Sequence, residues 1–247
     1  TGHGWLNVSQ AIERSCNYFF YETAVRMGIV TLEKYARYFG LGNKTGIELP
    51  SETSGIVSSK TSKEKLHPDE PTWGPGDTLQ SAIGQLDNEF SPLQMAKYIS
   101  ILANGGHQID VSIVKTIRKA DGTEASKEEI NSFVNQKLGI DEEQQEDLNI
   151  KQENLDAILA GMESVTQDSS GTAYVRFRDF NISVGGKTGS AEAPNNQVHA
   201  WFVGFAPFDD PEIAIVVMVE NGGHGNYTAE VVRDIMQEYF GMNTQNV

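Results

Sequence analysis

The sequence predicts an α+β protein built on an antiparallel sheet that helices cover. Residues 198–205 and 213–219 are apolar on both faces, as the central strands of a covered sheet are. The link between them, residues 207–211, is short and rich in proline and aspartate, so we expect the two strands to pair as an antiparallel hairpin. Segments with apolar residues at helical spacing lie before and after this hairpin.

Composition limits the classes of function. The chain has 247 residues and 38% hydrophobic content, which suffices for one large domain or two subdomains that share a core. A net charge of -15 and a pI near 4.7 argue against nucleic acid or an anionic membrane as a partner, because either needs a basic patch. No apolar run is as long as a membrane span, and no signal peptide is recognisable. Composition therefore leaves the compartment open.

The first part of the chain is predicted to be mainly helical. Apolar residues at helical spacing predict two helices within residues 8–27, which meet at residues 15–17 and stop at Gly28. Thr31 is expected to cap a third helix over residues 32–39.

The middle of the chain combines one clear helix with polar stretches. Residues 51–78 are rich in Ser, Lys, Pro and Gly and are expected to form a long surface excursion. A serine cap followed by proline predicts a helix over residues 91–103. Residues 109–117 alternate loosely and are expected to form a strand that turns at residues 120–122. Residues 123–146 are acidic and poor in aromatics, which predicts a solvated excursion or a flexible insertion.

The last part supplies two further helices and a strand. Apolar residues at helical spacing over residues 155–165 predict a helix that ends near residues 168–171. Ile182 and Val184 predict a strand with one buried face before Lys187. Thr228 is expected to cap a final helix. The face of that helix predicted to lie on the sheet consists of Val232, Ile235, Met236, Tyr239 and Phe240.

The tripeptide Lys-Thr-Gly occurs twice, at residues 44–46 and 187–189. On an edge strand it offers an ammonium, a hydroxyl and a bare backbone to a ligand with a carboxylate, and the glycine lets that ligand come close. The second copy precedes the two buried strands, whereas the first lies in a glycine-rich loop and is interpreted as a turn. For Lys187, the alternative is a buried, satisfied lysine on an ordinary strand.

A polar pair lies at the expected junction between the first two helices. Ser15 offers a hydroxyl that can shuttle a proton, and Asn17 offers an amide that can donate and accept. On this triplet alone, a simple helix cap is the favoured interpretation of Ser15. The run from Ser62 to Lys65 matches Ser-x-x-Lys, but it is charged throughout, and a catalytic lysine base must be desolvated. We therefore interpret that match as coincidence.

A set of short motifs then occurs in a fixed order. They are Gly2-His3-Gly4 with Leu6-Asn7, Ser15-Cys16-Asn17 with Phe20-Tyr21, Lys44-Thr45-Gly46-Ile47 with Leu49-Pro50, Gly76-Asp77, Ile83-Gly84-Gln85, Ser91-Pro92-Leu93-Gln94-Met95-Ala96, and Gly186-Lys187-Thr188-Gly189-Ser190-Ala191-Glu192. Together they resemble the transpeptidase domain of class B penicillin-binding proteins, most of all the elongation-type penicillin-binding protein 2 group. The resemblance covers nearly the whole chain apart from the acidic insertion.

This resemblance implies a penicillin-binding and serine β-lactamase-like transpeptidase fold, an antiparallel sheet flanked by helices plus a mainly helical subdomain. Residues 1–104 would form the mainly helical part, residues 105–180 a hairpin, the acidic insertion and a helix, and residues 181–247 sheet strands and the closing helix. In the family, Ser-x-x-Lys with the nucleophile lies upstream of Ser-x-Asn. The chain is therefore expected to be the C-terminal portion of one domain, with an unpaired edge on the strand at 213–219.

The activity implied by the resemblance is that of a peptidoglycan D,D-transpeptidase. Such an enzyme cross-links cell-wall stem peptides through a serine acyl-enzyme, is the target of β-lactam antibiotics, and acts at the extracytoplasmic face of the bacterial cell membrane. The implied partners are stem peptides, β-lactams, the missing N-terminal segment of the same protein and other cell-wall elongation proteins, without nucleic acid. The chain alone is expected to be inactive.

The resemblance also assigns roles to residues. The expected catalytic residues are Ser15, which would relay a proton to the leaving amine, Asn17, which would bind a substrate amide, and Lys187, which would supply positive potential.

On the substrate side, Thr188 would hydrogen-bond the substrate carboxylate, Gly189 would allow close approach, and the backbone N–H of Ser190 would form half of an oxyanion hole. Two other functions stay open. A D,D-carboxypeptidase or β-lactamase of the same fold would pass the acyl group to water, and a non-catalytic module would only bind wall precursors. A Ser-x-x-Lys in the preceding residues of the parent protein would decide the class.

No cofactor is required by these expectations. Cys16 is the single cysteine, and a zinc site with His3, His199 or His224 is chemically possible. The chain has no Cys-x-x-Cys or His-x-x-x-His spacing, so we expect Cys16 to pack inward without a metal.

Overall fold

A three-stranded antiparallel sheet forms the centre of the protein. The computed structural model describes residues 2–138, 150–193 and 196–242. In these ranges the strand order is β1-β2-β3, with β1 at Gly185–Ala193, β2 at Gln197–Ala206 and β3 at Ile213–Val219. β2 pairs antiparallel with both neighbours. The expected hairpin of residues 198–205 and 213–219 is therefore confirmed.

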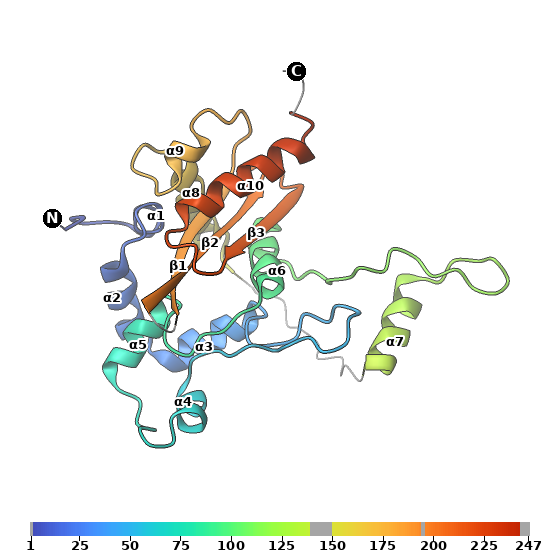
Figure 1. Ribbon diagram of the computed structural model, residues 1–247, viewed down its shortest axis with the longest axis horizontal. Coiled ribbons are helices and arrows are strands. Elements are labelled where there is room, and N and C mark those ends of the chain that lie inside the picture. Colours follow the sequence, from blue (N-terminus) through green and yellow to red (C-terminus); the bar gives the residue numbers. More distant parts are fainter. Residues whose placement is uncertain (1, 139–149, 194–195, 243–247) are drawn as a thin grey trace.

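Helices cover the sheet and build a second layer beside it. In the described residues they are α1 (Val8–Glu13), α2 (Asn17–Met27), α3 (Ile29–Tyr38), α4 (Lys60–Leu66), α5 (Pro75–Ala82), α6 (Pro92–Ala103), α7 (Lys127–Leu138), α8 (Gln152–Gln167), α9 (Tyr174–Phe177) and α10 (Asn226–Tyr239). Figure 1 shows α10 crossing in front of the sheet and α7 lying away from the body. In these ranges no helix is long and apolar enough to span a membrane.

Opposite faces of the sheet contact different helices, because successive strand residues point to opposite sides. Trp201 and Val203 line a pocket together with Met95 of α6. Phe202 points the other way and stacks on Phe177 of α9, with 5.6 Å between ring centroids. Burial on both faces of β2 over most of residues 200–206 explains why this part of the strand is apolar throughout.

The first part of the chain departs from two expectations. Gly28, with φ 78°, links α2 directly to α3, so Thr31 lies inside α3 and does not cap it. Residues 51–78 contain α4 and the first half of α5 rather than only an irregular excursion. α4 forms because Ser59 and Ser62 make a reciprocal capping box, which polarity alone does not reveal.

The middle of the chain also differs from its prediction. Residues 109–117 form no strand, and the expected hairpin is reduced to one bridge between Arg118 and Glu124. Within the acidic stretch 123–146, residues 127–138 form α7, because Ser126 and Glu129 cap its start reciprocally. Residues 139–149 of that stretch lie outside the described residues.

The closing helix buries a narrower stripe than expected. α10 buries Thr228, Ala229, Val232 and Met236, while Ile235 is 41% and Tyr239 52% exposed. Thr228 lies inside the helix, where its hydroxyl donates to the carbonyl of Gly225. The predicted contact of Ile235 and Tyr239 with the sheet is therefore wrong, since the three strands of the described ranges do not cover the whole predicted face of α10. The strand expected from Ile182 begins later, at Gly185.

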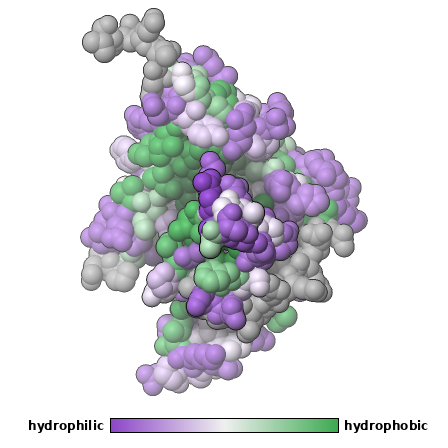
Figure 2. Space-filling view, turned by 90° about the vertical axis from the view of Figure 1, so that its right-hand side faces the viewer, coloured by the Kyte–Doolittle hydropathy of each residue, from purple (hydrophilic) through white to green (hydrophobic). Residues whose placement is uncertain are grey.

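β3 is an edge strand within the described part of the chain, as expected from the resemblance. Its residues other than Ile215 are partly or largely exposed. Figure 2, viewed from the side of β3 and α7, shows hydrophobic residues gathered on this face. An edge strand with apolar side chains favours pairing with a further segment.

Candidate active site

Two predicted catalytic residues that lie far apart in the sequence are in contact. The Nζ of Lys187 donates to the Oγ of Ser15 at 2.8 Å and to the carbonyl oxygen of Thr188 at 2.8 Å. A protonated lysine has three N–H donors. The third N–H has no acceptor among the described residues, so it is available to a ligand.

The position of Ser15 follows from the end of α1. The chain leaves α1 with Ser15 at φ 52°, a left-handed conformation that is costly for a residue with a side chain. α1 is held on α8 by a hydrogen bond from the Ser9 hydroxyl to the Ala157 carbonyl at 2.7 Å. Gly161 of α8 permits this approach, because a Cβ there would lie 2.9 Å from the Ser9 Cα. The strained turn is thus supported by tight helix packing.

Lys187 carries a perturbed ammonium. Its burial lowers its pKa from 10.5 to about 8, because desolvation penalises the charged form. At neutral pH the ammonium form still predominates. A lysine whose pKa is shifted by desolvation, and which lies in a pocket, is a candidate functional group.

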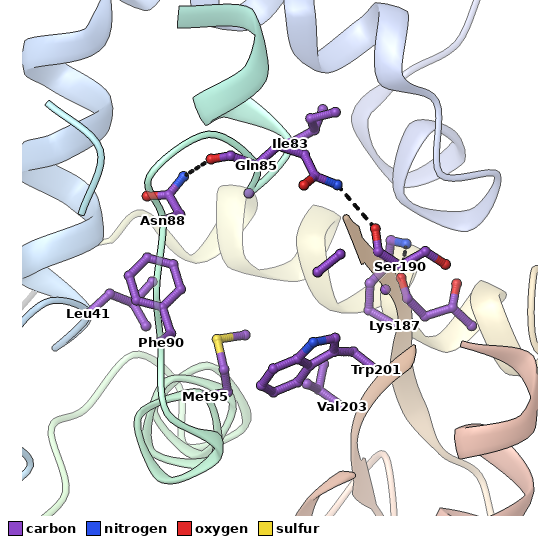
Figure 3. A pocket seen from close by; sticks show the side chains of 14 residues that line it. Leu41, Ile83, Gln85, Asn88, Phe90, Met95, Lys187, Ser190, Trp201 and Val203 are labelled. Atoms are coloured by element: carbon purple, nitrogen blue, oxygen red, sulfur yellow. Dashed lines mark hydrogen bonds between the residues drawn. The ribbon is translucent and has the colours of Figure 1, made fainter. Parts of the chain in front are cut away.

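A pocket opens beside Lys187 between the sheet and the helical part, as Figure 3 shows. Its walls differ in chemistry. β1 supplies a lysine and polar backbone groups, while the rest of the lining, from β2 and the helical part, is mainly apolar. The apolar lining comprises Leu41, Ile83, Phe90, Met95, Trp201 and Val203. A concave, largely apolar site with a few polar groups is typical of ligand binding.

Gln85 fastens the helical part to the outer edge of β1. Its Nε2 donates to the carbonyl of Ser190 at 3.2 Å, and its Oε1 accepts from the N–H of Glu192 at 3.3 Å. Asn88 in turn donates to the carbonyl of Gln85 at 3.0 Å, so the loop after α5 is itself held (Figure 3). Since the N–H and C=O of a strand residue point to the same side, the Ser190 N–H also faces this edge.

The other predicted residues of β1 lie against loops that the sequence did not single out. The Oγ1 of Thr188 is 2.8 Å from the Oγ1 of Thr172 in the turn before α9. A Cβ at Gly189 would lie 3.1 Å from the Cβ of Trp201, so a side chain at this position would press on the base of the Trp201 side chain. A Cβ at Gly225 would lie 2.6 Å from the Gly189 carbonyl oxygen. Thr172 has no local sequence signal. For Gly225, the glycine-rich run of residues 222–225 is a local sign that another backbone comes close.

Asn17 and Cys16 complete the predicted triplet. Asn17 is the first residue of α2 and is exposed, and in the described ranges its side chain makes no hydrogen bond. The structure therefore brings Ser15, but not Asn17, into contact with Lys187. Cys16 is 8% exposed and packs inward. In the described ranges no three His, Cys, Asp or Glu side chains are grouped to hold a metal ion, and the expectation of a metal-free Cys16 stays a prediction.

Ser-x-x-Lys sequences of this chain lie outside the pocket. In the match from Ser62 to Lys65, the Ser62 hydroxyl is engaged in the cap of α4 with Ser59. A second match runs from Ser112 to Lys115, and the Ser112 hydroxyl donates to the Glu48 carboxylate. None of these residues lines the pocket beside Lys187.

Comparison with known proteins identifies the family. The family described as "Penicillin binding protein transpeptidase domain" matches residues 1–237. The chain therefore belongs to the penicillin-binding protein transpeptidase family, and within it to the PBP2/MrdA type of class B. Peptidoglycan D,D-transpeptidase MrdA of Acinetobacter baumannii is 31% identical over 254 residues, covering 100% of this chain and 36% of that protein. MrdA of Haemophilus influenzae is also 31% identical, with 38% of that protein covered.

Solved structures agree with the fold. Pseudomonas aeruginosa PBP2 in complex with WCK 5153 superposes with a TM-score of 0.81 at 33% identity, covering 96% of this chain and 49% of that one. Helicobacter pylori PBP2 in complex with MreC gives 0.78 at 30% identity, covering 98% and 41%. The expected transpeptidase fold is confirmed. The chain spans less than half the length of each of these relatives.

Proposed function

We propose that the protein containing this chain is a peptidoglycan D,D-transpeptidase that cross-links stem peptides and is acylated by β-lactams. The observation that carries the proposal is the hydrogen bond from Lys187 to Ser15 in a pocket of a PBP2-type transpeptidase fold. The hydroxyl of Ser15 and the desolvated ammonium of Lys187 meet there although they lie 172 residues apart in the sequence. The arrangement suits a reaction that moves a proton beside a carboxylate-bearing substrate.

The proposed mechanism assigns each group one task. The attacking serine and the lysine that acts as its base are those of the family's Ser-x-x-Lys. The serine hydroxyl passes its proton to this lysine as it attacks the carbonyl that precedes a terminal D-alanine, and the backbone N–H of Ser190 stabilises the developing oxyanion. The lysine returns the proton by way of Ser15. Because Ser15 accepts its hydrogen bond from Lys187, its own proton is free to pass to the nitrogen of the leaving D-alanine. The amine of a second stem peptide then attacks the serine ester, which forms the cross-link and restores the serine.

The substrate carboxylate is proposed to lie at the edge of β1. The third N–H of Lys187 and the hydroxyl of Thr188 supply charge and a hydrogen bond there. Asn17 is proposed to bind a substrate amide. The chain as a whole is strongly acidic, with a net charge of -15, so a local cation is needed to attract a carboxylate.

We propose that the attacking serine belongs to a part of the protein outside this chain. In support, neither Ser-x-x-Lys of the chain lies in the pocket, and the relatives are far longer than the chain. The apolar wall of the pocket and the exposed edge of β3 are suited to receive that segment. No cofactor takes part in this scheme.

Intact-mass measurement after mixing with benzylpenicillin tests the proposal. The full-length protein is expected to gain one stoichiometric adduct, and this chain alone is expected to gain none. An unmodified full-length protein would contradict the proposed function. An adduct on this chain alone that disappears in Ser15→Ala would instead make Ser15 the nucleophile and Lys187 its base.

Product analysis separates the transpeptidase from a carboxypeptidase or β-lactamase. Incubated with a pentapeptide stem and an amine acceptor, the full-length protein is expected to form a cross-linked product that retains the acyl group. Release of D-alanine with hydrolysed stem only would show a carboxypeptidase, and rapid turnover of benzylpenicillin would show a β-lactamase.

Location and assembly are proposed by analogy. The full-length protein would act at the extracytoplasmic face of the bacterial membrane with other elongation proteins, since a PBP2 relative forms a complex with MreC. Protease accessibility in spheroplasts and co-purification with the cognate MreC-type protein test these two points.

A further inference from the structure

Thr172 lies outside every motif that carries the resemblance, yet it contacts the predicted substrate-binding strand. Its Oγ1 is 2.8 Å from the Oγ1 of Thr188. Thr188 and Ser190 are two residues apart on β1 and therefore present their side chains on the same face. Thr172 thus adds a third hydroxyl-bearing residue to that face at the edge of the sheet.

Helix α8 fixes the position of both threonines, through the turn that carries Thr172 and through the start of β1, which carries Thr188. The turn that carries Thr172 is fixed on the end of α8: Ala173 donates to the Val165 carbonyl at 3.0 Å. A Cβ at Gly171 would lie 2.3 Å from the Ser164 carbonyl oxygen, so only glycine allows this approach. Thr166 of α8 donates to the carbonyl of Val184, directly before β1. The same helix therefore positions both hydroxyls.

Counting protons decides what Thr172 can contribute. A hydroxyl has one proton to donate and lone pairs to accept. If Thr188 donates its proton to Thr172, that proton is not available to a ligand; if Thr172 donates, the Thr188 proton is free. A carboxylate at the edge of β1 accepts only, so it favours the second arrangement, and donation from Thr172 further polarises the Thr188 O–H.

We propose that Thr172 is a positioning residue that donates to Thr188 and so directs the Thr188 proton toward the ligand's carboxylate. This inference rests on the proposed function, and it adds a residue of the turn before α9 to the recognition of acidic ligands. Thr172 acts through Thr188. It selects for ligands with a free carboxylate over uncharged analogues.

The test compares acylation of the full-length protein by benzylpenicillin and by its uncharged methyl ester. Thr172→Val keeps the shape of the side chain but removes the hydroxyl, and Thr172→Ser keeps the hydroxyl. With benzylpenicillin, Thr172→Val is expected to lower the second-order rate constant about fivefold, as loss of a hydrogen bond between two neutral groups does. With the ester, the change is expected to stay within about twofold, and Thr172→Ser is expected to restore the rate with the acid.

Thr166→Val is the matched structural control, because it removes a buried hydroxyl from the same helix that supports β1. It is expected to affect acid and ester alike. Equal losses with acid and ester in Thr172→Val would make Thr172 merely structural and overturn the inference, as would an unchanged rate with the acid. A wild-type protein that neither compound acylates would instead refute the proposed function.

Discussion

The two Lys-Thr-Gly sequences of this chain fold into opposite kinds of site. At residues 44–46, the N–H and hydroxyl of Thr45 bind Glu52 Oε1 at 2.8 and 2.6 Å, and the Gly46 N–H binds Glu52 Oε2 at 3.2 Å. The loop therefore encloses a carboxylate of the protein itself. At residues 187–189 the same residue types lie on an edge strand that opens to a pocket.

The two lysines show the same contrast. Lys44 is exposed to solvent, whereas Lys187 is desolvated enough to lower its pKa to about 8. In the first copy, Thr45 and Gly46 already bind Glu52, whereas the second copy lines a pocket and places a perturbed cation beside Ser15. The chemistry of the tripeptide thus depends on what already fills its hydrogen bonds.

The largest expected difference is in acylation of the full-length protein. Lys187→Ala and Thr188→Ala are each expected to slow acylation by benzylpenicillin by about 10²-fold or more, because each removes a preorganised electrostatic donor. Lys44→Ala and Thr45→Ala are expected to stay within about threefold of wild type at a temperature where they remain folded. Stopped-flow or gel-based acylation rates check this. Equal losses from both pairs would remove the functional distinction between the two copies.

The next difference concerns pH. Raising the pH through about 8 deprotonates Lys187 and removes its positive charge, so acylation by a carboxylate-bearing β-lactam is expected to fall above that pH. Well above the pKa, the fall approaches about tenfold per pH unit. Rates measured from pH 6 to 10 give the profile.

Arginine variants provide the control for this profile. In Lys187→Arg the fall above pH 8 is expected to vanish even if the plateau rate is lower, because a guanidinium stays protonated. Lys44→Arg is expected to keep the wild-type profile. A wild-type rate that instead rises through pH 8 would make neutral Lys187 the active form, acting as a base.

In the loop of residues 44–46, the expected effect is smaller and falls on stability instead of on acylation. Thr45 is 7% exposed, so Thr45→Val leaves the Glu52 carboxylate short of a donor in a largely buried place. The free energy of unfolding is expected to fall by about 1–3 kcal/mol. Urea denaturation of the full-length protein measures it. Thr188→Val is the matched variant. Compared with Thr45→Val, it is expected to lower the free energy of unfolding less and the acylation rate more. If Thr188→Val lowered stability more and the acylation rate less, the contrast between the two copies would be contradicted.

The smallest expected effect distinguishes Gly46 from Gly189, the glycines of the two tripeptides. Gly46 has φ +86° and open space around it, so Gly46→Ala is expected to cost about 1–2 kcal/mol of stability through backbone strain while acylation is unchanged. Gly189 has no positive φ, but an added methyl would press on Trp201. Gly189→Ala is therefore expected to slow acylation more than it lowers the melting temperature, which thermal unfolding and rate measurements on both variants can show.

Several features were predictable because their causes are local. The strands of residues 198–205 and 213–219 were evident from their continuous apolar runs, and the helix over residues 91–103 from its Ser-Pro start. The prediction of secondary structure was wrong where a helix cap or a partner strand decided whether a segment became a helix or a strand. The Ser59–Ser62 cap made a helix in a polar stretch, and residues 109–117 found no partner strand in the described ranges.

The sequence by itself determined the family and predicted a strand with Lys187-Thr188-Gly189 before two buried strands, because ordered motifs and apolar patterns are properties of the chain alone. The functional choice between the two copies of that tripeptide stays a prediction. Only the tertiary structure decided that Lys187 donates to Ser15, that burial lowers its pKa to about 8, and that Thr172 and Gln85 hold β1. Contacts across 172 or 105 residues depend on how α1 packs on α8, how α8 packs on β1 and how α5 packs on α2. Desolvation likewise depends on every neighbour at once, so no local pattern encodes it.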